Sequence, residues 1–216
     1  MKLYYYLPTK FSLMNLRNRR LKISRLDELN DPFELVAANR ADKSQRTIWN
    51  DWQRTQIDKW GLICFSKTWR NPVMWSHYAD KHKGMCLGFE VPNDSILEVN
   101  YTKKRLNLDL IKLKEQGKLN QNHILKVFKT KFIDWKYERE ARVISHLENP
   151  DPETGFYFHS FDHQIKLTEI FAGPLCDLTE KEIIECLQPE DKNLKITKTR
   201  LAFNTFEIVE QKQGFK

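Results

Sequence analysis

No apolar run in this sequence is long enough to cross a lipid bilayer, which takes about 20 residues in a helix. The opening residues, Met-Lys-Leu-Tyr-Tyr-Tyr, lack the apolar stretch and the small-residue cleavage site of a secretory signal peptide. The four cysteines, Cys64, Cys86, Cys176 and Cys186, have no CxxC spacing. We therefore expect a cytoplasmic protein with reduced cysteines and no membrane segment.

The common catalytic motifs are absent as well. The sequence has no GxxxxGK[ST], GxGxxG, GxSxG or HExxH motif, which excludes the usual signatures of P-loop, dinucleotide-binding, hydrolase and zinc-protease sites. His77, His82 and Cys86 are close in sequence, but their spacings cross an expected helix end. Since these side chains would not share one face, we expect no metal site.

Positive charge is concentrated in two segments. Residues 101–136, here called the basic segment, contain ten Lys or Arg residues against three acidic ones, and this excess equals the net charge of +7 of the whole chain. A second cluster consists of Arg17, Arg19, Arg20, Lys22 and Arg25. Basic surfaces attract nucleic acid and other polyanions, so we expect such a partner for the basic segment. The alternative is a solvated surface without a partner.

The order of the expected elements predicts an α+β fold. Apolar alternation predicts strands at 3–7, 20–26, 62–66, 85–91, 96–101, 139–145, 156–161, 165–171, 195–199 and 206–209. Helical spacing predicts helices at 9–18, 44–60, 72–84, 106–116 and 120–135, and one that begins after Thr179 with a capping box. We predict a single domain, residues 1–216, with a mixed, mostly antiparallel central sheet and flanking helices.

Three local expectations follow from these assignments. Thr9 is the expected N-cap of the first helix. The strands at 156–161 and 165–171 are expected to pair with each other. Leu125, Phe128, Phe132 and Trp135 form an apolar stripe on the 120–135 helix, and we expect this stripe to pack on the sheet.

The segment Trp-Lys-Tyr-Glu-Arg-Glu-Ala-Arg-Val-Ile, residues 135–144, is the most informative part of the sequence. On a strand, Glu138, Glu140 and Arg142 would share one face. Neighbouring carboxylates perturb each other's pKa, and such pairs gather at active sites. Relief of their repulsion would leave stability unchanged or raised in Glu140→Gln. The alternative is a continuing helix in which Glu138 and Arg142 form an ordinary i,i+4 ion pair.

Two further segments could border a pocket. The first, Leu-Asn-Asp-Pro-Phe-Glu, forms a turn that offers Asn30, Asp31 and Glu34, although Asp31 alternatively just caps a helix that begins at Pro32.

In the second, a strand that ends in Ser66 precedes a helix with Trp75, His77 and Tyr78. Aromatic side chains on one helix face can stack on a base or a nicotinamide ring. The alternative is that Trp75 and Tyr78 only pack in the core.

Together these segments resemble a bacterial domain-of-unknown-function family, the one numbered twenty-nine seventy-one. The matching segments are 3–6, 29–34, 64–66, 74–79 with Lys83-Gly84, and 135–142. The resemblance covers most of the first 145 residues and continues weakly through 170–173. The family has no established activity, so this resemblance implies a grouping and not a reaction.

The order of the polar residues is also similar, more distantly, to the ADP-ribosyltransferase layout. That layout has a polar residue on the first strand, a serine at the end of a second strand and an ExE motif on a later one. The resemblance implies that Ser66 walls a nicotinamide pocket, that Glu140 holds the NAD ribose and that Glu138 aids the acceptor. Tyr5 stands where that superfamily has Arg or His, so Arg25 or Arg142 would have to anchor the nucleotide.

The sequence therefore leaves three functions open. The leading hypothesis is an ADP-ribosyltransferase-like effector that uses NAD as a substrate and acts on nucleic acid or protein. The second is a nucleic-acid-binding or processing module that uses the basic segment, with the carboxylates paired or bound to Mg²⁺. The third is a non-catalytic interaction domain of a bacterial defence or toxin system. The sequence does not specify an oligomeric state.

Overall fold

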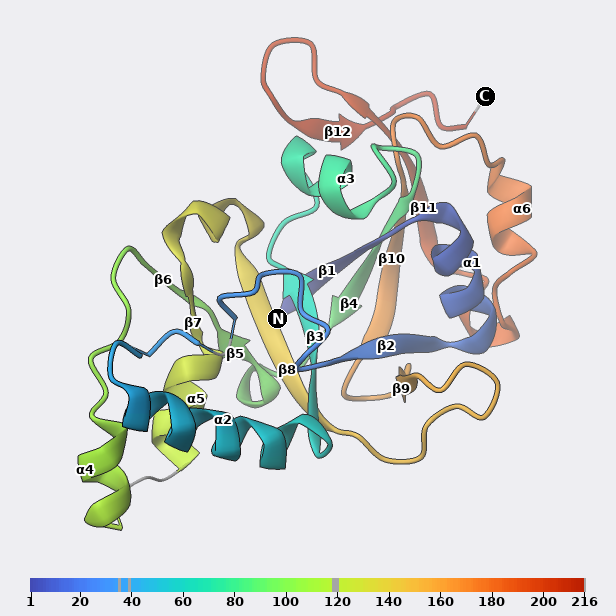
Figure 1. The fold of residues 1–216 in the computed structure, drawn as a ribbon. Helices are drawn as coiled ribbons and strands as arrows, with labels where there is room; N and C mark the ends of the chain where they lie inside the picture. The colour runs from blue at the N-terminus through green and yellow to red at the C-terminus, as the bar shows by residue number, and fades with distance from the viewer. Residues whose placement is uncertain (35, 39, 118–120, 216) are drawn as a thin grey trace.

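A ten-stranded mixed sheet forms the centre of the fold, which is of the α+β class. The computed structural model describes residues 1–34, 36–38, 40–117 and 121–215. The strands of this sheet are β1 (Lys2–Leu7), β2 (Arg20–Arg25), β3 (Trp60–Ser66), β4 (Met85–Glu90), β5 (Leu97–Glu98), β8 (Glu140–His146), β9 (Tyr157–Ser160), β10 (Lys166–Ala172), β11 (Lys195–Leu201) and β12 (Ile208–Glu210). Their order is β12-β11-β10-β4-β1-β3-β2-β9, and β8 joins β3 to β5 (Figure 1).

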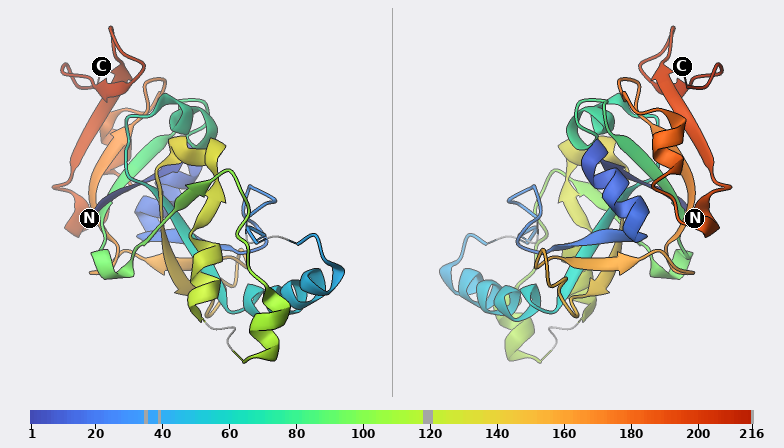
Figure 2. Two further views of the ribbon diagram at one scale, coloured as in Figure 1. Left: turned by 90° about the vertical axis from the view of Figure 1, so that its left-hand side faces the viewer. Right: turned by 90° about the vertical axis from the view of Figure 1, so that its right-hand side faces the viewer.

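Helices lie at both sides of the sheet. α1 (Thr9–Asn18) and α6 (Glu180–Ile184) lie beside β10 and β11, whereas α2 (Lys43–Ile57), α4 (Leu110–Glu115) and α5 (Gln121–Phe128) gather at the opposite side (Figures 1 and 2). There a short parallel pair, β6 (Asn100–Thr102) and β7 (Thr130–Phe132), lies beside them. α3 (Pro72–Tyr78) covers the end of β1. Single 3₁₀ turns are η1 (Asn93–Ser95), η2 (Ile133–Glu138) and η3 (Pro189–Asp191).

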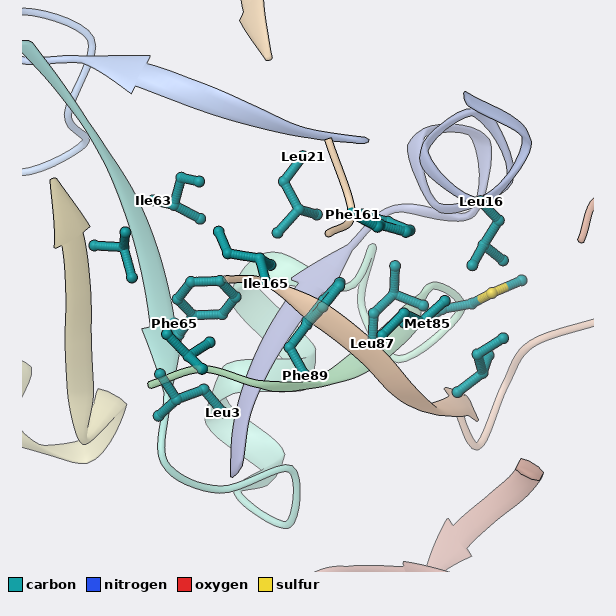
Figure 3. Packing of buried hydrophobic residues seen from close by; sticks show 14 of the residues in the cluster. Leu3, Leu16, Leu21, Ile63, Phe65, Met85, Leu87, Phe89, Phe161 and Ile165 are labelled. Carbon is teal, nitrogen blue, oxygen red and sulfur yellow. The ribbon is translucent and has the colours of Figure 1, made fainter. Parts of the chain in front are cut away.

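The main core lies on one face of this sheet. Leu3 of β1, Phe65 of β3 and Leu87 and Phe89 of β4 are fully or almost fully buried together (Figure 3). Side chains alternate along a strand, so Ala141 and Val143 of β8 join this core while Glu140 and Arg142 face the other side. Phe128, Leu62 and Leu26 form a smaller apolar cluster on that other side.

The sheet divides along one edge of β3. Among the described residues, β3 pairs with β1 at a single position, Tyr4 beside Ser66. At its other end β3 pairs instead with β2, through Leu62 and Gly61. The opposite edge of β3 is fully paired with β8 over seven positions. The divergence of β1 from β2 opens the sheet between them, and this opening positions the cleft described below.

The sequence predicted the central strands correctly. The strands expected at 62–66, 85–91 and 139–145 correspond to β3, β4 and β8, and the capping box between Thr179 and Glu182 is present at α6. The expected N-cap, Thr9, is wrong: the N-cap of α1 is Pro8, and the Thr9 hydroxyl donates to the carbonyl of Lys83 instead. Among the described residues, no helix is long and apolar enough to cross a membrane.

The helix expected at 120–135 is wrong in its second half. Asn120 lies outside the described residues, and α5 ends at Phe128. The chain then turns into β7, which pairs with β6, and Phe132 is 45% exposed. Of the expected stripe, only Phe128 is buried, while Leu125 and Trp135 are half-buried. Sheet pairing and the burial of Lys131 outweigh the local helical pattern here.

Two strand expectations are also corrected. The strand expected at 96–101 is divided into β5, which pairs with β8, and β6, which pairs with β7. β9 and β10 do not pair with each other: β9 pairs with β2, and β10 lies between β4 and β11. Pairing with strands that are distant in the sequence therefore determines where these strands lie.

Candidate functional site

A cleft of about 230 Å³ lies in the opening between β1, β2 and β3. It is lined by Tyr4, Tyr5, Tyr6, Ser24, Glu28, Leu29, Asn30, Glu34, Cys64, Phe65, Ser66, Met74, Tyr78, Lys131, Glu138 and Glu140. Aromatic rings from β1 form one wall, and charged side chains form the opposite end. We call this the tyrosine cleft.

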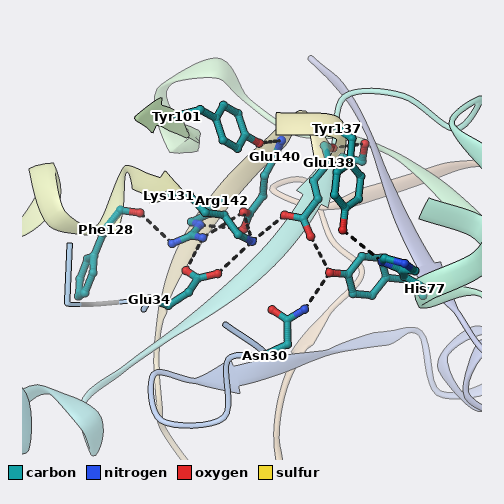
Figure 4. Close-up of polar contacts among 12 residues, drawn as sticks. Asn30, Glu34, His77, Tyr101, Phe128, Lys131, Tyr137, Glu138, Glu140 and Arg142 are labelled. Atoms are coloured by element: carbon teal, nitrogen blue, oxygen red, sulfur yellow. Dashed lines mark hydrogen bonds and ion pairs between the residues drawn. The ribbon is translucent and has the colours of Figure 1, made fainter. Parts of the chain in front are cut away.

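Five charged side chains meet at the end of the tyrosine cleft (Figure 4). They are Glu34, Lys131, Glu138, Glu140 and Arg142, and each is at most 8% exposed. We call this group the charge cluster. Three carboxylates face two cations, so the charge cluster carries a net charge of −1 when all five are ionised. Burial of unbalanced charge is costly, and such clusters are candidates for functional sites.

Lys131 lies at the centre of the charge cluster. Its Nζ is 2.6 Å from Glu138 Oε2, 3.0 Å from Glu140 Oε2 and 3.0 Å from Glu34 Oε1. Burial alone would lower the pKa of Lys131, but attraction to the three carboxylates raises it above its ordinary value. The ammonium group thus takes the position that a cation between these carboxylates would occupy. Among the described residues, no group of His, Cys, Asp and Glu side chains is arranged to hold a metal ion.

Arg142 is fully buried behind Lys131. Its Nε donates to Glu140 Oε1 at 2.7 Å, and its Nη2 donates to Glu34 Oε2 at 2.5 Å. Its Nη1 donates to the carbonyl of Phe128 at 2.9 Å, which ties β8 to the end of α5. The guanidinium is engaged within the fold, so the expectation that Arg142 anchors the nucleotide part of NAD is wrong.

The two central carboxylates have opposite pKa shifts. Burial raises the pKa of Glu138, and this effect outweighs the opposing effects of Lys131 and Tyr78. Burial also acts on Glu140, but attraction to Arg142 and Lys131 prevails and lowers its pKa to about 2. Glu140 is therefore a fixed negative charge near neutral pH, whereas Glu138 binds a proton more readily than an ordinary glutamate. Such divergent pairs are typical of acid–base sites.

Glu138 reaches the charge cluster by a different route from the one expected. It is the last residue of η2 and not part of the strand, which begins at Glu140. Arg139 between them adopts a left-handed conformation with φ of 47°, which reverses the chain locally. Both carboxylates consequently lie on the same side. The alternative of a continuing helix with a Glu138–Arg142 pair is also wrong.

Ser66 holds the backbone of Glu138 in place. Its hydroxyl donates to the carbonyl oxygen of Glu138 at 2.6 Å and accepts from the backbone N–H of Thr68 at 3.2 Å. Ser66 is 1% exposed and is the β3 partner of Glu140. In this arrangement Ser66 acts as a positioning residue at the wall of the cleft.

Ser66→Ala should lower the free energy of unfolding by about 1–3 kcal/mol, because the buried Glu138 carbonyl loses its donor. Ser145→Ala on β8 is the matched control, since its hydroxyl makes only a 3.4 Å contact with the neighbouring carbonyl. Its effect should stay within about 0.5 kcal/mol. Urea denaturation measures both values, and equal effects would argue against the positioning role.

A hydrogen-bonded chain leads from the charge cluster to the rim of the cleft. Tyr78 donates its hydroxyl to Glu138 Oε1 at 2.5 Å, and Asn30 donates its amide to the Tyr78 hydroxyl at 2.8 Å. Burial and the Glu138 charge both raise the pKa of Tyr78, so it remains a donor. His77 contacts the hydroxyl of Tyr137 at 3.1 Å instead. These contacts orient one oxygen of Glu138.

Most of the site residues predicted from the sequence do meet in this cleft. Those that line it are Tyr5, Asn30, Glu34, Ser66, Tyr78, Glu138 and Glu140. Asp31 lines a neighbouring cleft, and His77 lies beside Tyr137.

Trp75 and Arg25 do not line the cleft. Trp75 is fully buried, packs against Tyr6 and donates its indole N–H to the carbonyl of Trp69, so it belongs to the core. Arg25 pairs with Asp27 and Asp58, each at 3.1 Å, at the surface. The alternative in which Trp75 only packs in the core is therefore the one that the structure shows, and Arg25 lies outside the lining of the cleft.

Three other members of the basic cluster around residue 20 are also neutralised, whereas Arg17 forms no ion pair within the described residues. Arg19 pairs with Asp191, Arg20 with Asp151 at 2.6 Å and Lys22 with Glu28 at 2.9 Å. These pairs tie β2 to later parts of the chain. A polyanion would meet few free cations on this surface.

Sequence reasoning missed Lys131 and Tyr101. Lys131 is one of ten cations in the basic segment, and nothing in its local sequence marks it as buried. The Tyr101 hydroxyl accepts the backbone N–H of Glu140 at 2.7 Å, and burial raises its pKa to about 12. One signal was available in principle: three buried carboxylates need more than the one cation that Arg142 supplies, and the basic segment ends just before Glu138.

Comparison with known proteins gives one match. Residues 74–143 match the model of a family described as "Protein of unknown function (DUF2971)". This stretch runs from α3 to β8 and contains Tyr78, Lys131, Glu138, Glu140 and Arg142. No curated protein and no solved structure matches the chain.

Proposed function

We propose that this chain is an ADP-ribosyltransferase-like enzyme that cleaves NAD at the bond between nicotinamide and ribose. The ADP-ribose would pass to a nucleophile on nucleic acid or protein. The observation that carries the proposal is the carboxylate pair at the end of the tyrosine cleft, with Glu140 held ionised and Glu138 disposed to accept a proton.

The order of the strands around the cleft supports this proposal. The expected layout needs a first strand, a strand that ends in serine and a later strand that carries the ribose-binding glutamate. β1, β3 and β8 correspond to these, β3 pairs with both others, and Glu138 joins Glu140 from the preceding 3₁₀ helix η2. Ser66 lies at the junction, with Tyr4 on one side and Glu140 on the other.

The reaction would proceed through a cationic ribose carbon. The bond between ribose C1′ and the nicotinamide nitrogen breaks, and its electron pair leaves on nicotinamide, which becomes neutral. The acceptor's oxygen or nitrogen forms the new bond to C1′, and its proton passes to a carboxylate and then to water. A fixed negative charge stabilises the oxocarbenium-like centre, as in glycoside hydrolysis.

Glu140 supplies the fixed charge in this mechanism. Its low pKa keeps it ionised at every physiological pH, and Arg142 and Lys131 hold its oxygens in place. A preorganised carboxylate needs no reorientation as charge develops on the ribose. Glu140 would also hold a ribose hydroxyl as a hydrogen-bond acceptor.

Glu138 supplies the base. Tyr78 and Lys131 orient its two oxygens, and its raised pKa makes it the better proton acceptor of the pair. The base works only in its ionised form, so transfer should rise as the pH rises through the pKa of Glu138.

The size of the tyrosine cleft favours the nicotinamide end of NAD. At about 230 Å³ it is smaller than a typical site for a whole small-molecule ligand, which measures roughly 300–1,000 Å³. Tyr5, which is half-buried and lines the cleft with Ser66, offers aromatic surface for a flat ring. The adenosine end would extend beyond the cleft.

The proposal is tested by comparing two rates, the release of nicotinamide from NAD and the transfer of ADP-ribose to an acceptor. Wild-type protein incubated with NAD should release nicotinamide in excess over enzyme, as measured by liquid chromatography. Glu138→Gln should reduce transfer to an acceptor more than it reduces release, because the acceptor's proton has no base. Raising the pH should increase wild-type transfer and leave the residual transfer of Glu138→Gln unchanged.

The matched control is Glu148→Gln, at an exposed position just after β8. It should behave as wild type in both assays. Absence of nicotinamide release from folded wild-type protein, with any acceptor supplied, would refute the proposal and favour a non-catalytic binding domain.

A further inference from the structure

A second cleft of about 290 Å³ adjoins the tyrosine cleft. Three parts of the chain line it: residues 31–34 with 36–37, the segment that follows β6, and the strand β7. We call it the phenylalanine cleft. The two clefts share Glu34 and Lys131, whose ion pair of 3.0 Å separates them. The charge cluster thus borders two clefts, and the proposed NAD site occupies one of them.

Exposed aromatic rings flank the phenylalanine cleft. Phe33 is 58% exposed and Phe132 is 45% exposed, although each is a large apolar side chain. Exposed rings of this kind beside cations are the features on which unpaired bases stack in single-strand-binding proteins. The guanidinium of Arg105 already lies over the Phe33 ring at 5.3 Å.

The mouth of the phenylalanine cleft is strongly basic. Lys103, Lys104 and Arg105 are consecutive, exposed and part of its lining. In the part of the chain that the structure describes, none of the three forms an ion pair with a carboxylate. This differs from the cluster around residue 20, where Arg19, Arg20, Lys22 and Arg25 are paired with acids. Three free cations in a row match the spacing of a charged backbone better than a single anion.

Two more arginines extend this positive surface. Arg46 donates to the carbonyl of Arg40 at 2.9 Å, and burial together with repulsion from Arg105 and Arg46 lowers the pKa of Arg40. Arg40 donates to Asn50 at 2.9 Å, while its Nε is buried and has no hydrogen-bond partner among the described residues. Two acids line this cleft: Glu34 pairs with Lys131 and Arg142, and Asp31 is 5% exposed and accepts the backbone N–H of Phe33. A polyanion would relieve the repulsion between the arginines.

We infer that the phenylalanine cleft binds single-stranded nucleic acid, with an unpaired base against Phe132 or Phe33 and phosphates on Lys103, Lys104 and Arg105. A base in a duplex is stacked inside it and cannot enter such a cleft, so a single strand is the form that fits. Resting on the proposed function, we further infer that this strand is the acceptor. Its nucleophile would reach ribose C1′ and Glu138 by passing the Glu34–Lys131 pair, which lies between the two clefts.

The binding test uses fluorescein-labelled oligothymidylate and oligouridylate of 12 nucleotides and fluorescence anisotropy, without NAD. Wild-type affinity should fall steeply with salt concentration. In the triple variant Lys103→Gln/Lys104→Gln/Arg105→Gln, the slope of log affinity against log salt should become shallower by about 2, at roughly 0.7 for each phosphate that the protein no longer neutralises. Phe132→Ala should weaken binding about tenfold or more, since stacking contributes roughly 1–3 kcal/mol per base.

The triple variant Lys10→Gln/Lys192→Gln/Lys212→Gln is the matched control for charge. It removes the same three positive charges at exposed positions, and α1 and the C-terminus lie on the opposite side of the molecule from β6 and β7 (Figure 1). Its affinity should stay close to that of wild type. If Phe132→Ala unfolds, Phe33→Ala replaces it in the comparison.

Three results would overturn the inference: no binding at low salt, equal losses of affinity in both triple variants, or tighter binding of duplex DNA or polyglutamate than of the single strands.

Failure of the proposed function can be distinguished from failure of this inference. If the oligonucleotides bind as expected but nicotinamide is never released, binding stands and the acceptor role falls. If transfer occurs to protein only and no oligonucleotide binds, the transferase proposal stands and this inference falls.

Discussion

Arg142→Met is expected to lower the free energy of unfolding by about 3–5 kcal/mol, because it removes one of the two cations that pair with the buried carboxylates. Arg142 is fully buried and bonds to Glu34, Glu140 and the carbonyl of Phe128. Its removal would change the net charge of the charge cluster from −1 to −2. For a chain of this size the loss corresponds to a fall in Tm of roughly 6–20 °C.

Two further variants show whether charge balance is the cause. Arg54→Met, at an exposed position of α2, should change stability by no more than about 0.5 kcal/mol. The double variant Arg142→Met/Glu34→Gln restores a net charge of −1 and should be less destabilised than the sum of the two single variants. Strict additivity in urea denaturation would mean that the guanidinium acts mainly through packing.

Glu140→Gln is expected to reduce nicotinamide release by about 10²–10³-fold. This is roughly the loss seen when one preorganised electrostatic group is removed from an active site. The carboxamide keeps the size of the side chain but not its charge, so the oxocarbenium-like centre loses its stabilisation. The effect should fall on kcat more than on KM, because the interaction is strongest in the transition state.

The same variant should also destabilise the fold, contrary to the expectation from sequence. Repulsion between two acids suggested that Glu140→Gln would leave stability unchanged or raised. The pairing of Glu140 with Lys131 and Arg142 reverses that expectation, because the new amide group would point a donor at cations that are themselves donors. Activity must therefore be compared on folded protein, below the Tm of the variant. Unchanged release would contradict the catalytic role.

The sequence predicted the sheet well because its strands have strong local signals. β3, β4 and β8 are apolar runs bounded by turns, and their expected limits differ from the observed ones by at most two residues. The partner of each strand had no comparable signal. β9 and β10 are neighbours in sequence, yet β9 pairs with β2 and β10 with β4, because sheet pairing depends on long-range contacts.

The sequence predicted the three acids and Arg142 of the candidate site but missed its second cation, Lys131. Glu34, Glu138 and Glu140 were all expected near Ser66, and they do meet there. The sequence pattern places Lys131 in the helix predicted at 120–135, because Phe128 and Phe132 have helical spacing. Its position is decided by the parallel pairing of β7 with β6 and by the three buried carboxylates. For Trp75 the sequence leaves core packing and ligand binding open, since helical aromatic spacing is compatible with both, and its full burial decides for the core.

The most direct test of the central claim is a crystal structure of the wild-type protein with carba-NAD, in which a methylene group replaces the ribose ring oxygen so that the bond is not cleaved. We predict the nicotinamide ring in the tyrosine cleft beside Ser66, with a ribose hydroxyl within hydrogen-bond distance of the Glu140 carboxylate. Density for the dinucleotide only in the phenylalanine cleft, or a tyrosine cleft that stays empty at saturating ligand, would contradict the account.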